Sequence, residues 1–445
     1  MSQFDDLAIP MTYQDAVAQL YARIPEVIKP GLERIQALTN AMGNPETNAP
    51  IVHVVGTNGK TSTTLMAATL LQAFNLTVGS YTSPHLQVVN ERIRVNGEPI
   101  SDNDLLRITQ LLTPFLAVAD GSGHGTVSYF EALTGLAFAY FADVPVNVAV
   151  LEAGMGGKWD ATNVGHNDVV IITPIAMDHP ELGDTLVAKA KEKAAVIDPE
   201  STVICAPQHP DVMAIIRERC DAVSATLKVY GEDFELAGRE LAVGGQMIDI
   251  RGVGGETTEI FLPLLGHHQA INATLAYAAV EALFDFEAEL NAELVREGFV
   301  HAKSPGRLER IYRDGEPLVL LDGAHNPAGM ETLAQTLKQD FSFERTVLLI
   351  GMVADKDIET SAAIIADLAD VIVVTTPPSS RAGDPARLCD VLKARGKDVH
   401  CLNDVEAAFD AATNLTRSDH SDAIVVTGSL YLVGAIRDLL AEPPA

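Results

Sequence analysis

The segment from Ile51 to Thr64, IVHVVGTNGKTSTT, constrains the fold more than any other part of the chain. A run of β-branched residues stops at Gly56, and a helix-forming run begins after Lys60. Gly56 and Gly59 allow a tight turn whose N–H groups point at a bound anion, and the helix N-terminus adds a favourable dipole. We therefore predict a strand, a phosphate-binding loop and a helix, in a GTxGKT form shorter than the common Walker pattern.

This loop predicts a nucleotide site with a metal ion. Lys60 would place its charge against the β- and γ-phosphates, and the hydroxyl of Thr61 or Ser62 would bind Mg²⁺. An ordinary glycine-containing turn with a surface lysine is the alternative, which the flanking strand and helix patterns disfavour. The predicted nucleotide-binding residues of the loop are Gly56, Thr57, Asn58, Gly59, Lys60, Thr61 and Ser62.

Length and charge limit the possible partners. The 445 residues exceed what one hydrophobic core usually organises, so we expect two domains. With 31 Lys and Arg against 60 Asp and Glu, the net charge of -29 would repel nucleic acid and anionic membrane surfaces. The acidic start MSQFDDLAIP and the lack of an apolar run near ~20 residues predict a soluble, cytoplasmic protein that binds small molecules. Binding of anionic substrates then depends on a few local cations, namely Lys60, Arg92, Lys158 and Arg307.

The cysteines are scattered and show no CxxC spacing. We expect reduced thiols in a cytosolic chain, most simply as small buried hydrophobic side chains. They are Cys205, Cys220, Cys389 and Cys401.

Strand and helix patterns alternate through most of the chain and predict parallel sheets flanked by helices. Before the phosphate loop, helices are expected at Tyr13–Ile24 and from Pro30 to a stop at Gly43. Residues 227–262 form short alternating runs broken by glycine, which predict a small antiparallel sheet before an Ala-rich helix at His268–Leu283.

The pattern breaks at HAKSPGR, residues 301–307, and the strand and helix alternation then starts again. We therefore expect an α/β protein of two domains. Residues 1–300 would form a P-loop ATPase-like domain with a parallel-rich sheet and the small antiparallel sheet, and residues 301–445 a Rossmann-like α/β domain. No GxGxxG sequence follows a strand of the second domain, so no dinucleotide site is expected there.

Glu152 ends the predicted strand NVAVLEAG, and His179 ends the predicted strand IITPIAMD. The carboxyl ends of parallel strands share the sheet edge where the phosphate loop lies, so these side chains would converge on the phosphates. Carboxylate oxygens with one imidazole suit Mg²⁺ or Mn²⁺. Taken singly, each residue also has an ordinary explanation. A helix cap or a salt bridge would explain Glu152, and a satisfied hydrogen bond would explain His179. Lys193 of AKAKEKAAVI would lie on a solvated helix face.

Two turns of the second domain carry further candidates. LDGAHNPAG places Asp322, His325 and Asn326 after a buried strand, and VTGSLYLVG places Ser429 at a strand-to-helix turn. Asp322 would accept hydrogen bonds from a ribose, and Ser429 at a helix N-terminus would hold a carboxylate. Ordinary turn chemistry explains both motifs equally well.

Together these motifs resemble the folylpolyglutamate synthase/dihydrofolate synthase family, a branch of the Mur ligase superfamily of ATP-dependent amide-forming enzymes. The resemblance covers nearly the whole chain, and the ordered set is far more specific than any one motif. The matching pieces are GLERI, GTNGKTS, TSPHL with ERI, SYFEALT, LEAGMGGKWDATN, DH with LGDT and EKA, GHHQAINA, PGRLE, LDGAHNP, GMVADKD and VTGSLYLVG.

The resemblance implies which residues bind ATP and metal ions. The Lys60 loop would hold the ATP phosphates, and residues across the domain interface would complete the nucleotide site, namely Asn272, Arg307 and Asp322. Two Mg²⁺ ions would be bound by Thr61, Ser83, Glu152, His179 and Lys193. Lys193 matches a lysine that is carbamylated in such enzymes, which turns a cation into a metal-binding anion.

The resemblance also implies the remaining sites and the reaction. His325 and Ser429 would position glutamate, and folate or pteroate would bind the loop residues Thr82, Ser83, Pro84, His85 and Arg92. A substrate carboxylate would attack the γ-phosphate to give an acyl phosphate and ADP, and the glutamate amine would then attack the activated carbonyl. The catalytic residues implied are Lys60, Glu152, His179, Lys193 and His325.

The sequence departs from the family pattern in places. Thr61 stands where many members have Gly, Ala194 where Gly is usual, and Lys158 where Arg is frequent. The segment DHPELGDT is one residue short, so Lys191 is an alternative to Lys193 as the matching lysine.

Two other classes of protein stay open. A muramyl peptide ligase would need a nucleotide-sugar-binding domain of about a hundred residues before the loop, where this chain has 50 residues that read as two helices. A non-catalytic nucleotide-binding regulator would have lost Lys60, Glu152 or His179, and all three are present. The acceptor (dihydropteroate, reduced folate or both) and any K⁺ requirement are left open, and a monomer is expected.

Overall fold

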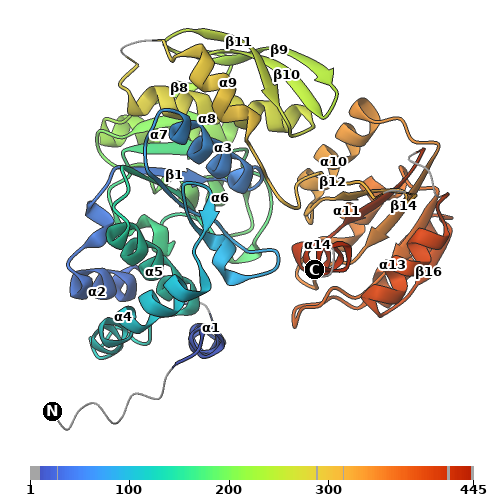
Figure 1. The fold of residues 1–445 in the computed structure, drawn as a ribbon, viewed down its shortest axis with the longest axis horizontal. Coiled ribbons are helices and arrows are strands. Elements are labelled where there is room, and N and C mark those ends of the chain that lie inside the picture. The colour runs from blue at the N-terminus through green and yellow to red at the C-terminus, as the bar shows by residue number, and fades with distance from the viewer. Residues whose placement is uncertain (1–10, 28, 287–288, 314, 418–420, 442–445) are drawn as a thin grey trace.

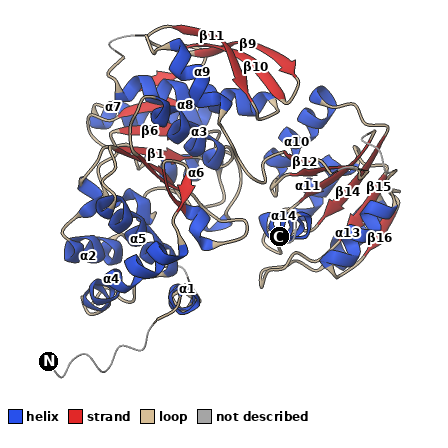
Figure 2. Cartoon of the chain, viewed as in Figure 1, coloured by secondary structure: helices blue, strands red, loops and turns tan. Residues whose placement is uncertain are grey.

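The computed structural model describes residues 11–27, 29–286, 289–313, 315–417 and 421–441. They form two α/β units, each built on its own sheet, and a small third sheet attached to the first unit (Figure 1, Figure 2). Most strands of the two larger sheets are parallel, which confirms the expected fold class.

The first sheet consists, in spatial order, of β4 (Glu98–Pro99), β3 (Ile93–Val95), β2 (Val78–Tyr81), β5 (Val148–Glu152), β1 (Ile51–Val55), β6 (Val169–Ile172), β7 (Thr202–Cys205) and β8 (Thr226–Val229). Every pair from β2 to β8 is parallel, and β3 and β4 add an antiparallel hairpin at one edge. β1 lies between β5 and β6, so the loops after these strands meet at the middle of one sheet edge.

The helices of this unit are α1 (Tyr13–Tyr21), α2 (Glu33–Met42), α3 (Lys60–Ala73), α4 (Asp102–Asp120), α5 (Tyr129–Asp143), α6 (Leu186–Ala194), α7 (Pro210–Val223), α8 (His267–Leu283) and α9 (Ala292–Val300). Helices cover both faces of the sheet because alternate strand residues point to opposite sides. Val52 and Val54 of β1 belong to the core that α3, α8 and α9 cover. Ile51 packs with α2, α4 and α5, and Val55 packs with α6 and α7.

The small sheet consists of β11 (Glu256–Leu262), β10 (Gly245–Arg251) and β9 (Glu235–Ala242), all antiparallel. It confirms the sheet expected within residues 227–262. β8, which begins that segment, instead pairs with β7 at the edge of the first sheet. Ile248 and Ile260 of the small sheet share the core of α3 and α8.

The sheet of the second unit consists, in spatial order, of β12 (Glu309–Ile311), β13 (Leu318–Leu321), β17 (Asp422–Thr427), β14 (Arg345–Ile350), β15 (Val371–Val374) and β16 (Val399–Cys401). All neighbours are parallel except β12 and β13. Its helices are α10 (Pro327–Asp340), α11 (Ile358–Ala366), α12 (Pro385–Ala394), α13 (Val405–Asn414) and α14 (Leu430–Leu440). Two hydrophobic clusters, one on each face, give the Rossmann-like arrangement predicted.

Two helix ends differ from expectation. The first helix ends at Tyr21 rather than Ile24, because Pro25 disfavours a helical conformation of the residue before it. The second begins at Glu33 rather than Pro30, since Gly31 takes a positive φ of 146° that a helix does not contain.

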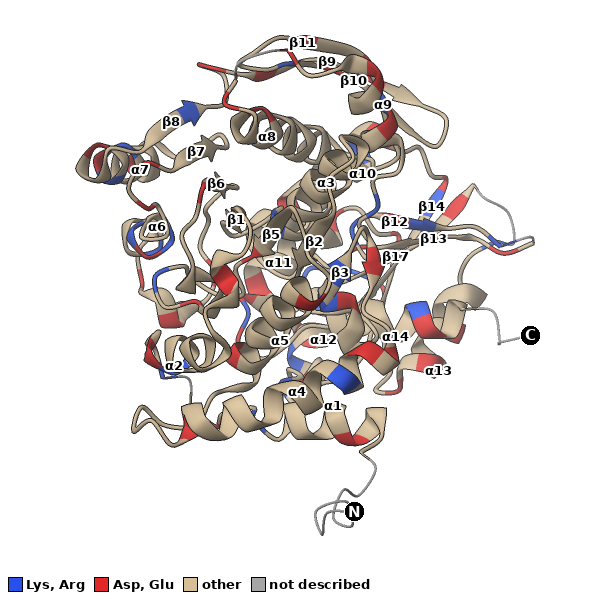
Figure 3. Cartoon of the chain, turned by 60° about the vertical axis from the view of Figure 1, so that its left-hand side comes forward, with Lys and Arg blue, Asp and Glu red and all other residues tan. Residues whose placement is uncertain are grey.

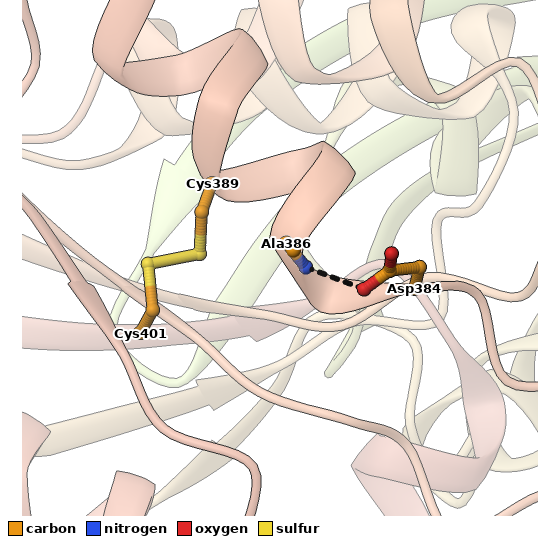
Figure 4. Close-up of a disulfide and its surroundings, with 4 residues drawn as sticks. All are labelled: Asp384, Ala386, Cys389 and Cys401. Atoms are coloured by element: carbon orange, nitrogen blue, oxygen red, sulfur yellow. Dashed lines mark hydrogen bonds between the residues drawn. A yellow bond between two sulfur atoms is a disulfide. The ribbon is translucent and has the colours of Figure 1, made fainter.

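The expectation of four reduced cysteines is wrong in the second unit, where Cys389 of α12 and Cys401 of β16 form a disulfide (Figure 4). Their Cα atoms are 6.4 Å apart. α12 begins at a cap in which Asp384 accepts a hydrogen bond of 2.9 Å from the Ala386 N–H, and the helix packs against the edge strand β16. Spacing along the chain did not reveal this pair, because only the packing of helix on strand brings the cysteines together. Cys205 and Cys220 are free and buried, as predicted.

No helix among the described residues is long and apolar enough to cross a membrane. Figure 3 shows acidic positions on helices of both units, so the net charge of -29 is not confined to one of them.

Candidate active site

A cavity of about 1770 Å³ lies between the two units and gathers most of the predicted site residues. It is lined by the phosphate loop, by the loops after β2, β5 and β6, and by the turns that begin α10 and α14. The candidate residues absent from the lining are Gly56, Thr82, His85, Lys158, Lys193 and Asn326. The structure therefore brings most of the candidate residues to one cavity, although some of them lie outside its wall.

The phosphate loop turns at two glycines that nothing larger could replace. Gly56 has a φ of 145°, and a Cβ there would lie 1.9 Å from Thr173 Oγ1. Gly59 has a φ of 92°, and a Cβ there would lie 2.7 Å from the Asn272 side chain of α8. Gly59 thus lets α8 approach the loop closely, which explains how Asn272 comes beside the predicted nucleotide site.

Three side chains of the loop point in different directions. Lys60 Nζ lies across the loop and donates to the carbonyl oxygens of Gly56 at 3.3 Å and Thr57 at 3.1 Å. Burial lowers the pKa of its ammonium, and the charges of Glu152 and Asp178 oppose that shift. Ser62 turns away into a buried network with Ser304 and Gln269, whereas Thr61 turns toward β5.

Glu152, at the end of β5, is the centre of an oxygen-rich cluster. It is 2% exposed and accepts hydrogen bonds from Thr61 Oγ1 at 2.9 Å and from the Ser83 N–H at 3.0 Å. Burial raises the pKa of this carboxyl, and the charge of Lys60 opposes the rise. The predicted meeting of strand ends therefore holds for Glu152, because β2, β5 and β1 are direct neighbours.

His179 reaches the cavity by a different route from the one predicted. β6 ends at Ile172, and His179 lies beyond it at the start of the short 3₁₀ helix Pro180–Leu182, with a left-handed φ of 50°. The strand stops early because Pro174 has no N–H for a ladder hydrogen bond. Burial lowers the pKa of the His179 imidazole to about 4, which keeps its ring neutral near pH 7. A neutral imidazole is the form that binds metal ions.

Helix α6 places the two candidate lysines, Lys191 and Lys193, in different surroundings. Lys191 is exposed, whereas Lys193 is 4% exposed and its Nζ donates to the Gly56 carbonyl at 2.6 Å. Burial and, to a smaller extent, the neighbouring charge of Lys60 together lower the pKa of Lys193 to about 7. The interpretation of this stretch as a solvated helix face is wrong for Lys193.

The second unit contributes two helix N-termini. Ser429 caps α14 by accepting the Tyr431 N–H at 3.1 Å, and Asn326 caps α10 by accepting the Gly329 N–H at 2.8 Å. The carboxylate of Asp322 accepts the N–H of Ala324 in its own loop and the N–H of Leu308, just before β12, both at 2.9 Å. Ser429 and Asp322 thus serve in turns and also line the cavity, whereas Asn326 lies outside the cavity wall.

Contacts between the units gather around Asp178, which the sequence did not single out. Its carboxylate accepts Lys356 Nζ at 2.6 Å and Asn326 Nδ2 at 3.2 Å, and lies 3.6 Å from His325 Nε2. Asn326 also exchanges amide hydrogen bonds of 3.2 and 3.1 Å with Asn58 of the phosphate loop. In the sequence, Asp178 and Lys356 stand out only as members of the DH and ADKD pieces of the family motifs. Which residues they contact depends on how the two units pack together.

The loop after β2 is organised by Arg92. Arg92 Nε donates to His85 Nδ1 at 2.9 Å, and its guanidinium lies 5.5 Å from the centre of the Tyr129 ring. Tyr129 stacks on Tyr21 with ring centres 5.2 Å apart. Of the residues predicted here, Ser83, Pro84 and Arg92 line the cavity, and Tyr129 is an additional lining residue that the sequence did not predict.

The donor set fits a hard divalent cation. The described residues contain no group of three or more His, Cys, Asp and Glu arranged to hold a metal ion. Mg²⁺ does not require one, because it takes one or two carboxylates and fills its other positions with water and substrate phosphates. Glu152 with the Thr61 hydroxyl, beside a phosphate loop, is a site of that kind.

Comparison with known proteins agrees with this geometry. A family model described as the Mur ligase middle domain matches residues 54–280, and one described as the Mur ligase, glutamate ligase domain matches residues 306–430. The fold, the loop and the cavity therefore define an ATP-dependent ligase of the Mur type. The dihydrofolate synthase/folylpolyglutamate synthase of Mycobacterium tuberculosis is 41% identical over 454 aligned residues, covering 95% of this chain and 92% of that protein. This chain belongs to the folylpolyglutamate synthase/dihydrofolate synthase family.

Solved structures support the same assignment. Mycobacterium tuberculosis folylpolyglutamate synthase complexed with ADP superposes with a TM-score of 0.92 at 38% identity, covering 97% of this chain and 99% of that chain. A structure described as an FPGS–AMPPCP–folate complex gives a TM-score of 0.85 at 33% identity, covering 97% and 100%. The resemblance drawn from the motifs is confirmed, and the muramyl ligase and regulator alternatives are not favoured.

Proposed function

We propose that this protein uses ATP to join L-glutamate to the free carboxylate of dihydropteroate, of a reduced folate, or of both, releasing ADP and phosphate. One observation carries the proposal: a single cavity sets the phosphate loop of the first unit opposite the helix N-termini of the second. Both are features that bind anions, and the reaction brings three anionic substrates together. The ADP, AMPPCP and folate named for the related structures support the substrate classes.

The reaction has two steps. An oxygen of the acceptor carboxylate attacks the γ-phosphorus, the bond to the β–γ bridging oxygen breaks, and ADP leaves. The glutamate amine then attacks the acyl carbon, phosphate leaves with the electrons of the C–O bond, and the amine loses a proton. Lys60 and Arg307, both on the cavity wall, would offset the negative charge of the first step. Closure of the two units over the cavity would limit loss of the acyl phosphate to water.

We assign the metal ions and the modified lysine on chemical grounds. One Mg²⁺ would bind at Thr61, Ser83 and Glu152, and a second at His179, where the ions would neutralise phosphate charge. Carbamylation joins the neutral amine of Lys193 to CO₂ and releases a proton. A pKa of about 7 supports this assignment, because much of the amine is then neutral near pH 7.

The other substrates are assigned to the two sides of the cavity. Glutamate would be held by His325 and Ser429, and the acceptor by the loop that contains Ser83, Pro84 and Arg92. Asn272 and Asp322 would complete the nucleotide site. We keep the domain division at residues 1–300 and 301–445, a monomer and a cytoplasmic location as predictions.

ADP release tests the function directly. The purified protein is incubated with Mg²⁺, ATP and L-glutamate, with dihydropteroate or tetrahydrofolate as acceptor. Release with dihydropteroate alone identifies a dihydrofolate synthase, release with tetrahydrofolate alone a folylpolyglutamate synthase, and release with both a bifunctional enzyme. Release with neither acceptor overturns the proposal.

A further inference from the structure

Helix α6 carries a second buried lysine besides Lys193. Lys189 lies one helical turn earlier, so both side chains project from the same face. Lys189 is 1% exposed. Buried lysines are rare, because burying an ammonium group without hydrogen-bond partners is costly. Its Nζ donates to the carbonyl oxygen of His179 at 2.7 Å. The proposed metal site therefore accounts for Lys193 but leaves the burial of Lys189 unexplained.

The acceptor of this hydrogen bond is an unusual piece of backbone. His179 has a φ of 50° and a ψ of 85°, in the left-handed region that side chains other than glycine and asparagine seldom adopt. Such a conformation persists only where surrounding contacts hold it. Two contacts do so here. The carbonyl of His179 accepts Lys189, and its N–H donates to Asp178 Oδ1 at 2.9 Å.

Lys189 does not itself take part in the cavity. It is absent from the cavity wall, whereas His179 is part of it. No ion pair joins Lys189 to a carboxylate among the described residues, although Asp178, Glu181 and Asp184 are close enough to favour its charged form. Its ammonium is thus directed at one neutral backbone oxygen, which is an arrangement suited to holding a loop.

We propose that Lys189 is a positioning residue that fixes the backbone of His179, so that the imidazole is presented to the cavity in one orientation. This inference rests on the proposed function, in which His179 binds a metal ion. Helix α6 would then hold both sides of the proposed metal site, with Lys193 beside the phosphate loop and Lys189 behind the His179 loop. The imidazole needs this support because its own loop adopts a costly conformation.

The test compares Lys189→Met, which keeps the length of the side chain but removes the donor, with Lys189→Arg, which keeps a donor. Lys191→Met is the matched control, because Lys191 is on the same helix and exposed. In ¹³C-histidine NMR spectra without substrates, with the His179 signal assigned by its loss in His179→Asn, we expect that signal to shift or broaden only in Lys189→Met. Because this readout needs no turnover, it stays informative even if the proposed ligase activity is absent.

Kinetics provide the second measurement. We expect Lys189→Met to lower kcat about ten- to hundredfold and to raise the Mg²⁺ concentration for half-maximal rate, with KM for ATP unchanged. Lys189→Arg should recover most of the rate. The proposal is overturned if the His179 signal is the same in Lys189→Met as in the wild type. It is also overturned if Lys191→Met loses as much activity. If Lys189→Met does not fold, Lys189→Ala replaces it in the test. An unchanged His179 signal, an unchanged rate and an unchanged Mg²⁺ affinity in Lys189→Ala would then overturn the proposal.

Discussion

The carboxylate of Asp178 and the ammonium of Lys356 lie 2.6 Å apart across the junction of the two units, although 178 residues separate them in the chain. Both side chains are 7% exposed. Burial alone would raise the pKa of Asp178, but its contact with His325 and the charges of His179 and Lys356 outweigh burial and hold that pKa well below the ordinary range. The closed arrangement of the cavity is thus held by a buried ion pair.

Removal of either partner is expected to favour separation of the units, because the other charge is left buried and unpaired. Asp178→Asn and Lys356→Met should each lower kcat/KM for glutamate about tenfold or more. The fold loss of kcat/KM in the double variant should be much smaller than the product of the two single losses. This difference corresponds to a coupling energy of about 1 kcal/mol or more. Independent, multiplicative losses in this double-mutant cycle would contradict a functional pair.

Substitution of Lys60, the lysine of the phosphate loop, tests the role of that loop. Lys60→Ala should abolish ADP formation and leave the fold intact, as judged by an unchanged circular dichroism spectrum. The reason is that, within the described part of the chain, the Lys60 ammonium donates hydrogen bonds only to carbonyl oxygens of its own loop. Lys191→Ala, which removes an exposed lysine, is the control and should keep full activity. Wild-type turnover in Lys60→Ala would remove the phosphate loop from the mechanism.

Ser429 has two roles that one experiment separates. Ser429→Ala should raise KM for glutamate about tenfold, as expected for loss of a hydrogen bond to a charged group. It should also cost about 1 kcal/mol of stability through loss of the α14 cap. Ser101→Ala is the control, because Ser101 caps α4 in the same way and lies outside the cavity wall. If both variants leave KM unchanged, Ser429 is only a cap.

The buried amine of Lys193 makes stability depend on pH. Its pKa is lowered from 10.5 to about 7 in the folded protein, so between these values the unfolded chain binds the extra proton. Stability relative to Lys193→Met should therefore rise with pH from about 7 to about 10, by about 1.4 kcal/mol per unit. Urea unfolding of both proteins in CO₂-free buffer with EDTA measures this difference. A difference that is constant over this range would show an unperturbed amine.

The disulfide predicts a thiol count. In denaturant without reductant, two cysteines should react with an alkylating reagent, namely Cys205 and Cys220, and four should react after reduction. Mass spectrometry gives the number directly. Four reactive thiols before reduction would restore the expectation drawn from the sequence.

Whether the position of a residue could be predicted from the sequence depended on which interactions determine that position. Glu152 was placed correctly because the ends of adjacent parallel strands meet whatever their helices do. His179 was assigned to a strand end because the proline that stops β6 lies inside an otherwise strand-like run. Lys189 looked solvated in a charged helix, since burial there depends on a distant loop carbonyl. Asp178 and Lys356 lie in the DH and ADKD pieces of the family motifs, but the sequence did not reveal that they pair, because their contact exists only once the two units meet.

The small sheet has a consequence for how the cavity opens. Arg239 of β9 pairs with Asp340 at the end of α10, whose carboxylate is 1% exposed and also accepts the Gly266 N–H at 3.0 Å. The units also meet where the Gln87 side chain bonds Arg437 and Asp438 of α14 and where Asp178 pairs with Lys356. If the Asp340 attachment persists while the contacts of Gln87 and Asp178 break, the second unit swings about Asp340 as a pivot. Substrates would then enter, and products leave, on the side of the molecule away from the small sheet.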